Sequence, residues 1–382
     1  MKSKILLGLG TATLLAAVLP AQTSVLFPKG FDRVEGSSSA YSASSGAPWS
    51  ISTTATSRVF RNQLVIDLDP TVKGKVSGIV YRRDGTLEAG QAMSGVWAEL
   101  EVNLSTAATT SSSISTTFAS NIGSDAVNVV AKKKVNFSPA PYIGMFPEPF
   151  LVRLPFDSGR SLAYDGSKGS LMIEFIGHDN NLYDAVNSKS IYWDLDRAYN
   201  STSAPYLSLG QGEAWSLWKP GMNHYQYMYV SGGNLQLYSY VNYAKPQSVV
   251  AWITTLDGLV PKAGNALPNG SPWYLDLGKM IDLQATIAGD DGYARFPASG
   301  YHVLPYDKSW AGINLDGQCL SIDPTTSEMW SSNAYRRQVP LYDANGSIPA
   351  ASVYKSGATA HTDATGYSGG TGYSPVMKLE LL

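Results

Sequence analysis

The sequence is poor in the residues from which reactive and metal sites are built. It has one cysteine, Cys319, in 382 residues, so no disulfide can form within the chain. Cys319 alternates with its neighbours over 317–322, and we expect a buried, unreactive thiol because no histidine lies near it in the sequence. The four histidines are far apart, at His178, His224, His302 and His361. No two of them have the spacing of metal ligands.

Charged residues are also scarce. They make up 15% of the chain, with 28 basic and 30 acidic side chains and a formal net charge of −2. No basic stripe is present, and the one basic run, 132–134, fits a solvated loop or strand end. This composition disfavours nucleic-acid binding and electrostatic docking on a membrane.

Long apolar runs are missing except near the N-terminus. Lys2 and Lys4 precede an uncharged stretch over 5–19, a proline breaks it, and Ala21 offers a small residue for cleavage. The stretch is shorter than the roughly 20 residues that a spanning helix needs, and this order of features is that of a secretory signal peptide. We predict a signal peptide over 1–21, a mature protein that is secreted or at the cell surface, and no membrane span after cleavage.

Helical periodicity is hard to find, and turn signals take its place. Asp-Gly and Asn-Gly dipeptides tolerate positive φ and suit hairpin turns. They recur at 84–85, 165–166, 257–258, 269–270, 291–292, 316–317 and 345–346. Short alternating or apolar runs lie between them, such as 64–68, 78–81, 96–102 and 171–176. Strand runs at this spacing predict an all-β fold, here two jelly-roll-like β-sandwich domains after the signal peptide.

We place the boundary between the two domains at 245/246, where a new series of strands opens. A large sandwich is expected over 22–245 and a smaller one over 246–382. Within the smaller domain, 357–374 is rich in Gly, Thr, Ala and Tyr and is expected to be a flexible loop. The alternation over 377–381 suits a last strand that closes a sheet.

Several stretches resemble a recurrent kind of secreted protein from large-genome environmental bacteria. The N-terminal part matches over 31–38, 78–85 and 150–156, and the C-terminal part over 275–278, 290–294 and 318–324. The resemblance implies a β-domain that starts at a Val-Glu-Gly motif, 34–36, followed by a C-terminal β-sandwich. These proteins are uncharacterised, so the resemblance implies fold and location and supplies no active site.

No catalytic motif stands out, and no catalytic residue is predicted. Residues 366–370 match the Gly-x-Ser-x-Gly pattern of a hydrolase nucleophile elbow but lack a helix after the serine and a later histidine. A carboxylate pair for glycoside hydrolysis needs only to be close in space. The glutamates that lie near aromatic residues are Glu148, Glu174 and Glu213. We expect all three to be solvated surface residues, because most carboxylates are.

No organic cofactor is predicted. Calcium is the metal best suited to acidic loops of exported β-domains, because hard cations prefer oxygen ligands. The candidate ligands are Glu174, His178 and Asp179 on one segment, and Asp194 and Asp196 on another. No complete calcium-loop spacing is present, so no metal site is assigned.

The sharpest local feature is a tyrosine-rich hairpin over 224–243. Period two places tyrosines on one face of each strand: Tyr225, Tyr227 and Tyr229 on the first, Tyr238 and Tyr240 on the second. Whether the two sets share a face depends on the register, which the sequence leaves open. A shared face would form a flat aromatic surface able to stack on sugar rings. The favoured interpretation is that cross-strand pairs stabilise the hairpin, at about 0.2–1 kcal/mol each.

These observations favour an exported extracellular or cell-surface β-protein with a structural or adhesive role. One alternative is a carbohydrate-binding protein that uses exposed aromatics, with an extracellular polysaccharide or another envelope component as partner. A second alternative is a jelly-roll glycosidase or polysaccharide lyase, which needs carboxylates facing each other in a cleft. Buried tryptophans favour the first reading, an exposed aromatic row the second and an aromatic cleft with acids the third.

Overall fold

In a computed structural model the chain is described over 23–36, 59–85, 97–137, 146–180, 183–184, 189–190, 195–216, 219–260, 265–267, 270–298 and 300–382. The predicted signal peptide over 1–21 lies outside these residues. Within them, the regular elements are β-strands and short 3-10 helices, which confirms the all-β prediction. In the same residues, no helix has the length and apolar character needed to cross a membrane.

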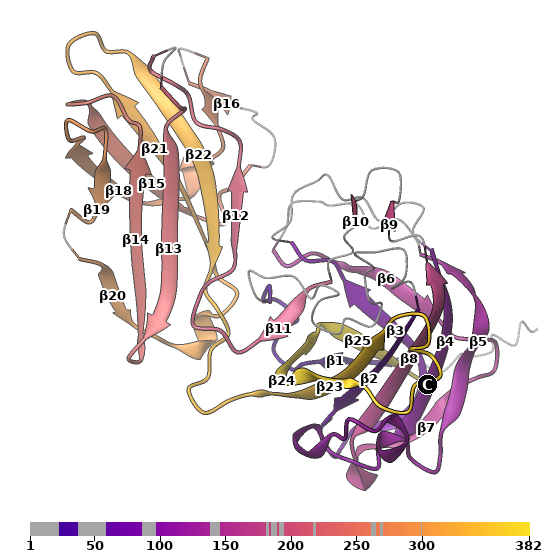
Figure 1. The fold of residues 1–382 in the computed structure, drawn as a ribbon. Helices are drawn as coiled ribbons and strands as arrows, with labels where there is room; N and C mark the ends of the chain where they lie inside the picture. The colour runs from indigo at the N-terminus through magenta and orange to yellow at the C-terminus, as the bar shows by residue number, and fades with distance from the viewer. Residues whose placement is uncertain are drawn as a thin grey trace, which may run out of the picture.

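The strands build two lobes, each with two facing sheets (Figure 1). In the first lobe, the smaller sheet has the order β1-β25-β3-β6, with β7 also paired to β3. These strands are β1 (Thr23–Phe27), β3 (Lys73–Arg82), β6 (Phe150–Pro155), β7 (Leu162–Asp165) and β25 (Met377–Leu381). The larger sheet has the order β11-β24-β23-β2-β8-β4-β5. Its strands are β2 (Phe60–Ile66), β4 (Trp97–Thr106), β5 (Val127–Asn136), β8 (Leu171–Asn180), β11 (Arg197–Tyr199), β23 (Ile348–Ser356) and β24 (Tyr367–Pro375).

Alternation along these strands builds the core between the two sheets. Leu64, Ile173 and Leu104 lie side by side on β2, β8 and β4 and are buried. Ile79 and Leu379, paired across β3 and β25, close the core from the other sheet. Burying each such side chain stabilises the fold by about 1.5–3 kcal/mol, so the last strand of the chain is part of the first lobe's core.

The second lobe is also a sandwich. One sheet has the order β12-β22-β21-β15-β18, and the facing sheet joins β13, β14 and β19, with β20 also paired to β14. The first sheet contains β12 (Tyr206–Leu209), β15 (Val249–Leu256), β18 (Met280–Ile287), β21 (Asn314–Ile322) and β22 (Met329–Gln338). The second contains β13 (Asn223–Ser231), β14 (Asn234–Asn242), β19 (Ala294–Phe296) and β20 (His302–Pro305). Trp252, Phe296, Val241 and Cys319 pack between them.

Cys319 is buried and free, and burial raises the pKa of its thiol well above the ordinary value. This confirms the expectation of a buried, unreactive cysteine. The remaining short elements lie in connections. They are β9 (Tyr183–Asp184), β10 (Lys189–Ser190), β16 (Asn265–Ala266), β17 (Pro272–Trp273), η3 (Ser111–Ser113), η4 (Phe118–Asn121), η5 (Gly166–Lys168), η6 (Leu277–Lys279) and η7 (Lys308–Trp310).

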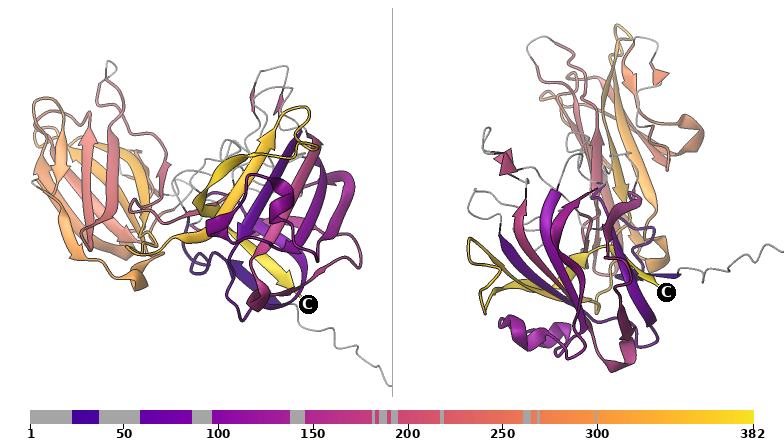
Figure 2. Two further views of the ribbon diagram at one scale, coloured as in Figure 1. Left: turned by 60° about the horizontal axis from the view of Figure 1, so that its bottom comes forward. Right: turned by 90° about the vertical axis from the view of Figure 1, so that its right-hand side faces the viewer.

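The sheet pairings divide the chain differently from the expected boundary at 245/246. The hairpin β13–β14 pairs with β19 and β20 from beyond that boundary, and β23 to β25 pair with strands of the N-terminal part. The second lobe is therefore an insertion between β11 and β23. Figures 1 and 2 show this as yellow C-terminal strands lying among the indigo and purple strands of the first lobe.

Two local expectations were wrong. Asp316-Gly317 was expected to be a turn but lies inside β21, where the buried Asp316 accepts hydrogen bonds from Nε and Nη2 of Arg336 at 2.6 and 2.9 Å. The expected loop 357–374 contains most of β24, because the sheet supplies partners that the low-complexity sequence does not reveal. The elbow-like motif 366–370 runs into the same strand and has no helix after it. The predicted last strand is confirmed as β25.

Candidate functional site: a tyrosine face on the second lobe

The predicted hairpin forms, and its register answers the question that the sequence left open. Tyr225 pairs with Tyr240 and Tyr227 with Tyr238 across β13 and β14. Residues directly opposite in an antiparallel pair point to the same side of the sheet. The turn is Gly232-Gly233, with φ of +56° and +74°, as a two-residue hairpin loop of the primed type requires. All five predicted tyrosines, Tyr229 included, therefore share one face.

That face points away from the core of the lobe. The alternate residues of the hairpin, among them Met228, Val230 and Leu235, are buried in the sandwich. Four further tyrosines join the five of the hairpin through ring contacts. We call the whole set the tyrosine face: Tyr206, Tyr225, Tyr227, Tyr229, Tyr238, Tyr240, Tyr293, Tyr301 and Tyr335.

The central rings stand on edge and stack on one another. The centroids of Tyr227 and Tyr238 are 4.8 Å apart with planes 6° from parallel, and those of Tyr225 and Tyr240 are 5.0 Å apart at 25°. Tyr227 and Tyr240 stack diagonally at 5.8 Å and 15°. Rings this close and this parallel cover each other's faces and present edges and hydroxyls outward. The expectation of one flat aromatic surface is therefore wrong for the centre of the face.

The rim of the face differs from its centre. Tyr206, Tyr293 and Tyr301 are 41%, 39% and 43% exposed. The Tyr301 ring stands nearly perpendicular to the rings of Tyr238 and Tyr229, at 78° and 84°. Aromatic surface is therefore open to solvent at the rim of a stacked and hydroxyl-bearing centre.

Two arginines supply the charge of the face. The Arg295 guanidinium lies 5.1 Å from the Tyr238 ring centroid and 5.4 Å from that of Tyr301. Its Nη2 donates to the carbonyl of Gly300 at 3.0 Å, and within the described residues its Nε has no hydrogen-bond partner. Cation–π contacts of this kind fix a donor beside the rim.

The second arginine, Arg337, is buried beneath the rings and closes the free side of β13. Its Cζ lies 4.4 Å from the Tyr206 centroid, and its Nε and Nη1 donate to the carbonyls of Gln226 and Ala204 at 2.5 and 2.9 Å. Burial lowers its pKa to about 10, so it stays charged at neutral pH. Asn333 lies on the same side of β13, where its Oδ1 accepts from the N–H of His224 at 2.7 Å. The face therefore rests on a strand whose free side is occupied by side chains.

The hydroxyls of Tyr238 and Tyr240 stay protonated at neutral pH. Burial raises the pKa of Tyr238 and Tyr240, with the neighbouring Tyr227 adding to both shifts. The Tyr227 and Tyr240 oxygens are 3.4 Å apart, close enough for one to donate to the other. A neutral phenol both donates and accepts, so the centre of the face offers paired donors and acceptors above an aromatic base.

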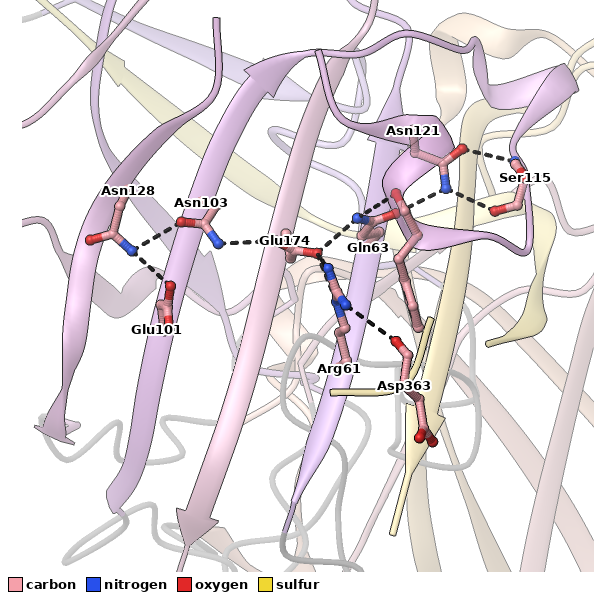
Figure 3. A network of polar contacts seen from close by, with 10 residues as sticks. Arg61, Gln63, Glu101, Asn103, Ser115, Asn121, Asn128, Glu174 and Asp363 are labelled. Atoms are coloured by element: carbon pink, nitrogen blue, oxygen red, sulfur yellow. Dashed lines mark hydrogen bonds and ion pairs between the residues drawn. The ribbon is translucent and has the colours of Figure 1, made fainter. Parts of the chain in front are cut away.

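The glutamates considered for catalysis make contacts within the fold instead. Glu174 lies in a polar row across the larger sheet of the first lobe (Figure 3), where it accepts from Arg61 Nε, Gln63 Nε2 and Asn103 Nδ2 at 2.9, 2.8 and 2.9 Å. Gln63 also donates to the carbonyl of Phe118 at 3.1 Å and so holds η4 on the sheet. Glu174 therefore serves as a buried acceptor within the fold.

The other two glutamates are also engaged structurally. Glu213 Oε2 accepts from the N–H of Ser331 in the second lobe at 3.0 Å, so Glu174 and Glu213 lie in different lobes and do not face each other. Glu148 is buried in the first lobe. The expectation of solvated surface positions was wrong for Glu148 and Glu174, because the sheet and its loops cover both.

The structure assigns no metal site. In the part of the chain that it describes, no three His, Cys, Asp or Glu side chains are grouped as metal ligands. Asp194 lies outside the described residues. Asp196 is buried and accepts from Arg82 Nε at 2.5 Å and from the N–H of Gly36 at 2.9 Å. Calcium binding stays a prediction.

Tryptophan does not contribute to an exposed aromatic row. The six described tryptophans are buried or half-buried: Trp97, Trp215, Trp252, Trp273, Trp310 and Trp330. By the criterion set from the sequence, this favours a structural or adhesive protein, while the exposed rim of the tyrosine face favours a binding protein. Both interpretations concern the same surface, the tyrosine face.

Comparisons with known proteins add little to this geometry. No family model and no curated protein matches the chain. Among solved structures, β-glucuronidase of Parabacteroides merdae is 9% identical with a TM-score of 0.20, covering 77% of this chain and 29% of that one. A Bacteroides uniformis β-glucuronidase is 10% identical with a TM-score of 0.16, covering 77% and 27%. The chain thus spans less than a third of these proteins, and scores this low carry no argument about fold or activity.

The sequence identified five of the nine tyrosines and missed both arginines. The missing residues are distant in the chain, and no local pattern places them beside the hairpin. One weak signal was present: 293–295 and 335–337 both read Tyr-x-Arg, and period two puts the two side chains of such a triplet on one strand face. Tyrosine and arginine are also the residues most enriched at binding surfaces.

Proposed function

We propose that the protein is an exported, non-catalytic adhesive protein that binds extracellular polysaccharide through the tyrosine face. One observation carries the proposal: eight tyrosines from β12, β13, β14 and two adjoining loops gather on one surface whose rim rings are exposed, and the buried Tyr335 of β22 packs beneath them. A surface of this composition goes beyond what a single hairpin needs for its own stability.

The chemistry of the face suits sugars. The exposed rings of Tyr206, Tyr293 and Tyr301 offer apolar area on which the C–H face of a pyranose can stack. The phenol hydroxyls of the centre supply donors and acceptors that match sugar hydroxyls. The guanidinium of Arg295, held over the rings of Tyr238 and Tyr301, adds a charge-assisted donor for a hydroxyl or a carboxylate of the polysaccharide.

A purely structural role is the second candidate, and it too has an observation in its favour. The faces of Tyr225, Tyr227, Tyr238 and Tyr240 are taken up by mutual stacking, so these rings also stabilise the hairpin. The two candidates differ in what the rim does. Binding needs exposed rim rings, whereas packing needs only the centre.

The deciding experiment uses the rim. In the full exported chain, Tyr206→Ala, Tyr293→Ala and Tyr301→Ala are combined, and retention on insoluble polysaccharides is measured beside binding to a glycan array. We expect loss of about tenfold or more in affinity, since stacked rings each contribute roughly 0.5–1.5 kcal/mol beyond their buried area. Tyr367→Ala is the matched control, because Tyr367 is an exposed tyrosine of the first lobe.

Three results would count against the proposal. The wild-type protein retains no polysaccharide and binds no glycan, the triple variant binds as the wild type does, or the control loses as much as the triple variant. A thermal midpoint close to that of the wild type shows that the triple variant is folded. If the wild-type protein retains no polysaccharide and binds no glycan, a purely structural role is left as the function of the tyrosine face.

A further inference from the structure

Strand β18 is an edge strand with an exposed apolar face. It pairs with β15 along one side, from Val249↔Ile287 to Thr254↔Asp282. Among the described residues no strand pairs with its other side. Ile281, Leu283 and Ile287 are 56%, 56% and 63% exposed, and Ala285 between them is exposed as well. The alternate residues point inward, as shown by Gln284, whose Nε2 lies 2.7 Å from His302 Nε2 in the facing sheet.

From Leu283 to Ile287 this edge lacks the protection that exposed strands normally carry. Natural edge strands are guarded by lysine, proline, bulges or covering loops, because free N–H and C=O groups next to apolar side chains invite pairing with another chain. In β18 the one charged residue is Asp282, and a register shift against β15 leaves Ile281 as a bulge at the start of the strand. From Leu283 to Ile287 the strand has neither a charge, nor a proline, nor a bulge. Leu277 and Met280, just before the strand body, extend the exposed apolar surface. An apolar stretch of this kind marks an interaction surface.

The sequence of β18 is complementary to itself. If two copies pair antiparallel about Gln284, Leu283 lies opposite Ala285 of the second copy, and Ile287 lies opposite the bulge residue Ile281 of the second copy. Asp282 then lies opposite Thr286 of the second copy, and the two Asp282 residues are four positions apart, at about 14 Å for a rise of about 3.4 Å per residue. That distance exceeds the Debye length of about 8 Å at physiological ionic strength, so like charges do not oppose the pairing.

We propose that two copies of this protein dimerise by pairing their β18 strands. The two five-stranded sheets then join into one continuous sheet, and the exposed apolar side chains of each copy lie beside those of the other on one face of that sheet. The interface is isologous and closed, as a two-fold dimer requires. A second copy of the chain is the partner that the sequence of β18 favours, because every pair in this register matches apolar with apolar or polar with polar.

The pairing has a consequence for the tyrosine face, which rests on the proposed function. The two-fold axis of an antiparallel strand pair runs perpendicular to the sheet, so both copies keep the same side of the sheet on the same side of the dimer. The five hairpin tyrosines of the face belong to the sheet that packs on that side, whereas Tyr206 and Tyr335 lie on β12 and β22 of the same sheet as β18. Both tyrosine faces therefore point the same way, and a long polysaccharide can engage two sites at once, which raises avidity without new contacts.

The dimer is tested by sedimentation velocity of the full chain over a wide concentration range. We expect a monomer–dimer equilibrium that shifts to monomer in the double variant Leu283→Lys/Ala285→Lys, because both lysines would lie in the paired face. The variant is expected to keep the thermal midpoint of the wild type, because both side chains are exposed and make no core contacts. Measuring the midpoint confirms that the variant is folded. The control is Leu151→Lys, an exposed apolar residue on β6 of the first lobe.

A second variant fixes the register. In Leu283→Cys/Ala285→Cys, oxidation is expected to link the two copies covalently, because the thiol introduced at position 283 would face the one at position 285 of the second copy, while the native Cys319 is buried. A wild-type protein that is monomeric at all concentrations overturns the proposal, as does a dimer that persists in the lysine variant or an absence of cross-linking in a dimer. None of these results depends on polysaccharide binding, so failure of the dimer and failure of the proposed function are separable.

Discussion

The backbone N–H of Glu35 donates a hydrogen bond to Oε1 of Gln338, 303 positions further along the chain, with 2.5 Å between the heavy atoms. Gln338 ends β22 in the second lobe, so this bond ties the lobes together where the chain passes between them. The Glu35 carboxyl is buried, and its Oε1 accepts from the N–H of Gly85 at 2.9 Å. The Val-Glu-Gly motif and the stretch 78–85, both singled out in the sequence, therefore meet at this junction.

The Glu35 carboxyl predicts a specific pH dependence of stability. Burial, and then the neighbouring Asp196, raise its pKa well above the ordinary value of 4.5. A carboxyl with a raised pKa in the folded state contributes stability that is fully present below the ordinary pKa and is lost as pH rises through the raised value. We expect Glu35→Gln, which keeps an acceptor for Gly85, to gain stability relative to the wild type as pH rises above 4.5. Urea unfolding of both proteins across pH measures this, and a flat or opposite trend contradicts it.

His224 predicts a loss of stability toward acid. It is buried on the inner side of β13, its Nε2 lies 2.6 Å from Oγ of Ser239, and burial lowers its pKa to about 3. The unfolded chain takes up a proton near the ordinary value of 6.5 while the folded chain does not. Unfolding is therefore favoured as pH falls from 6.5 toward 3, by up to about 1.4 kcal/mol per pH unit from this residue.

The variant His224→Gln tests this slope, because glutamine can keep a hydrogen bond to Ser239 but does not titrate. Its free energy of unfolding, compared with that of the wild type at pH 8 and at steps down to pH 4, should show a shallower fall in acid. Equal slopes for the two proteins would rule out His224 as the source.

The stacked centre of the tyrosine face predicts a large difference between hydroxyl removal and ring removal. Tyr227→Phe/Tyr240→Phe keeps the stack and should change the free energy of unfolding by less than about 1 kcal/mol, since one long, part-buried hydrogen bond contributes little. Tyr227→Ala/Tyr240→Ala removes two stacked, half-buried rings and should destabilise by about 3 kcal/mol or more. Chemical denaturation of the two double variants measures this difference. Equal effects of the two pairs would mean that the rings do not support the hairpin.

The inserted lobe predicts how truncation affects folding. Removing 348–382 takes away β23, which lies between β24 and β2, and β25, which lies between β1 and β3. We expect the first lobe to unfold and the second to persist as a protease-resistant fragment near 200–342. A fragment of 246–382 should not fold, because it lacks β13 and β14. A compact, protease-resistant 246–382 fragment would contradict the insertion and favour the boundary at 245/246.

Export makes a prediction at the N-terminus. The protein recovered outside a producing cell should begin at Gln22, after removal of 1–21, because a cleaved signal peptide leaves the residue after the cut as the new terminus. Intact-mass measurement of the recovered chain checks this. A recovered chain that retains residues 1–19 would contradict both export by a cleaved signal and the extracellular setting of the proposed function.

Local pattern was enough to predict that a strand forms and which of its faces is buried. Alternating tyrosines on either side of Gly232-Gly233 predict the hairpin β13–β14 and which tyrosines share a face within each strand. The register that brings the two sets onto one face came only from the structure. The alternation over 377–381 predicts β25, and the apolar surroundings of Cys319 predict its burial. In each case a period of two reports which face is buried.

Partner choice between distant strands was decided only by the tertiary structure. The backbone groups that join β23 to β2 or β25 to β3 are the same in every residue, so the sequence of a strand does not name its partner. For this reason the insertion of the second lobe, the strand at Asp316 and the recruitment of Tyr206, Tyr293, Tyr301 and Tyr335 were not visible in the sequence. The orientation of the rings was decided in the same way, because whether tyrosines lie flat or stack on edge depends on which rings the folded sheets bring within about 5 Å of one another.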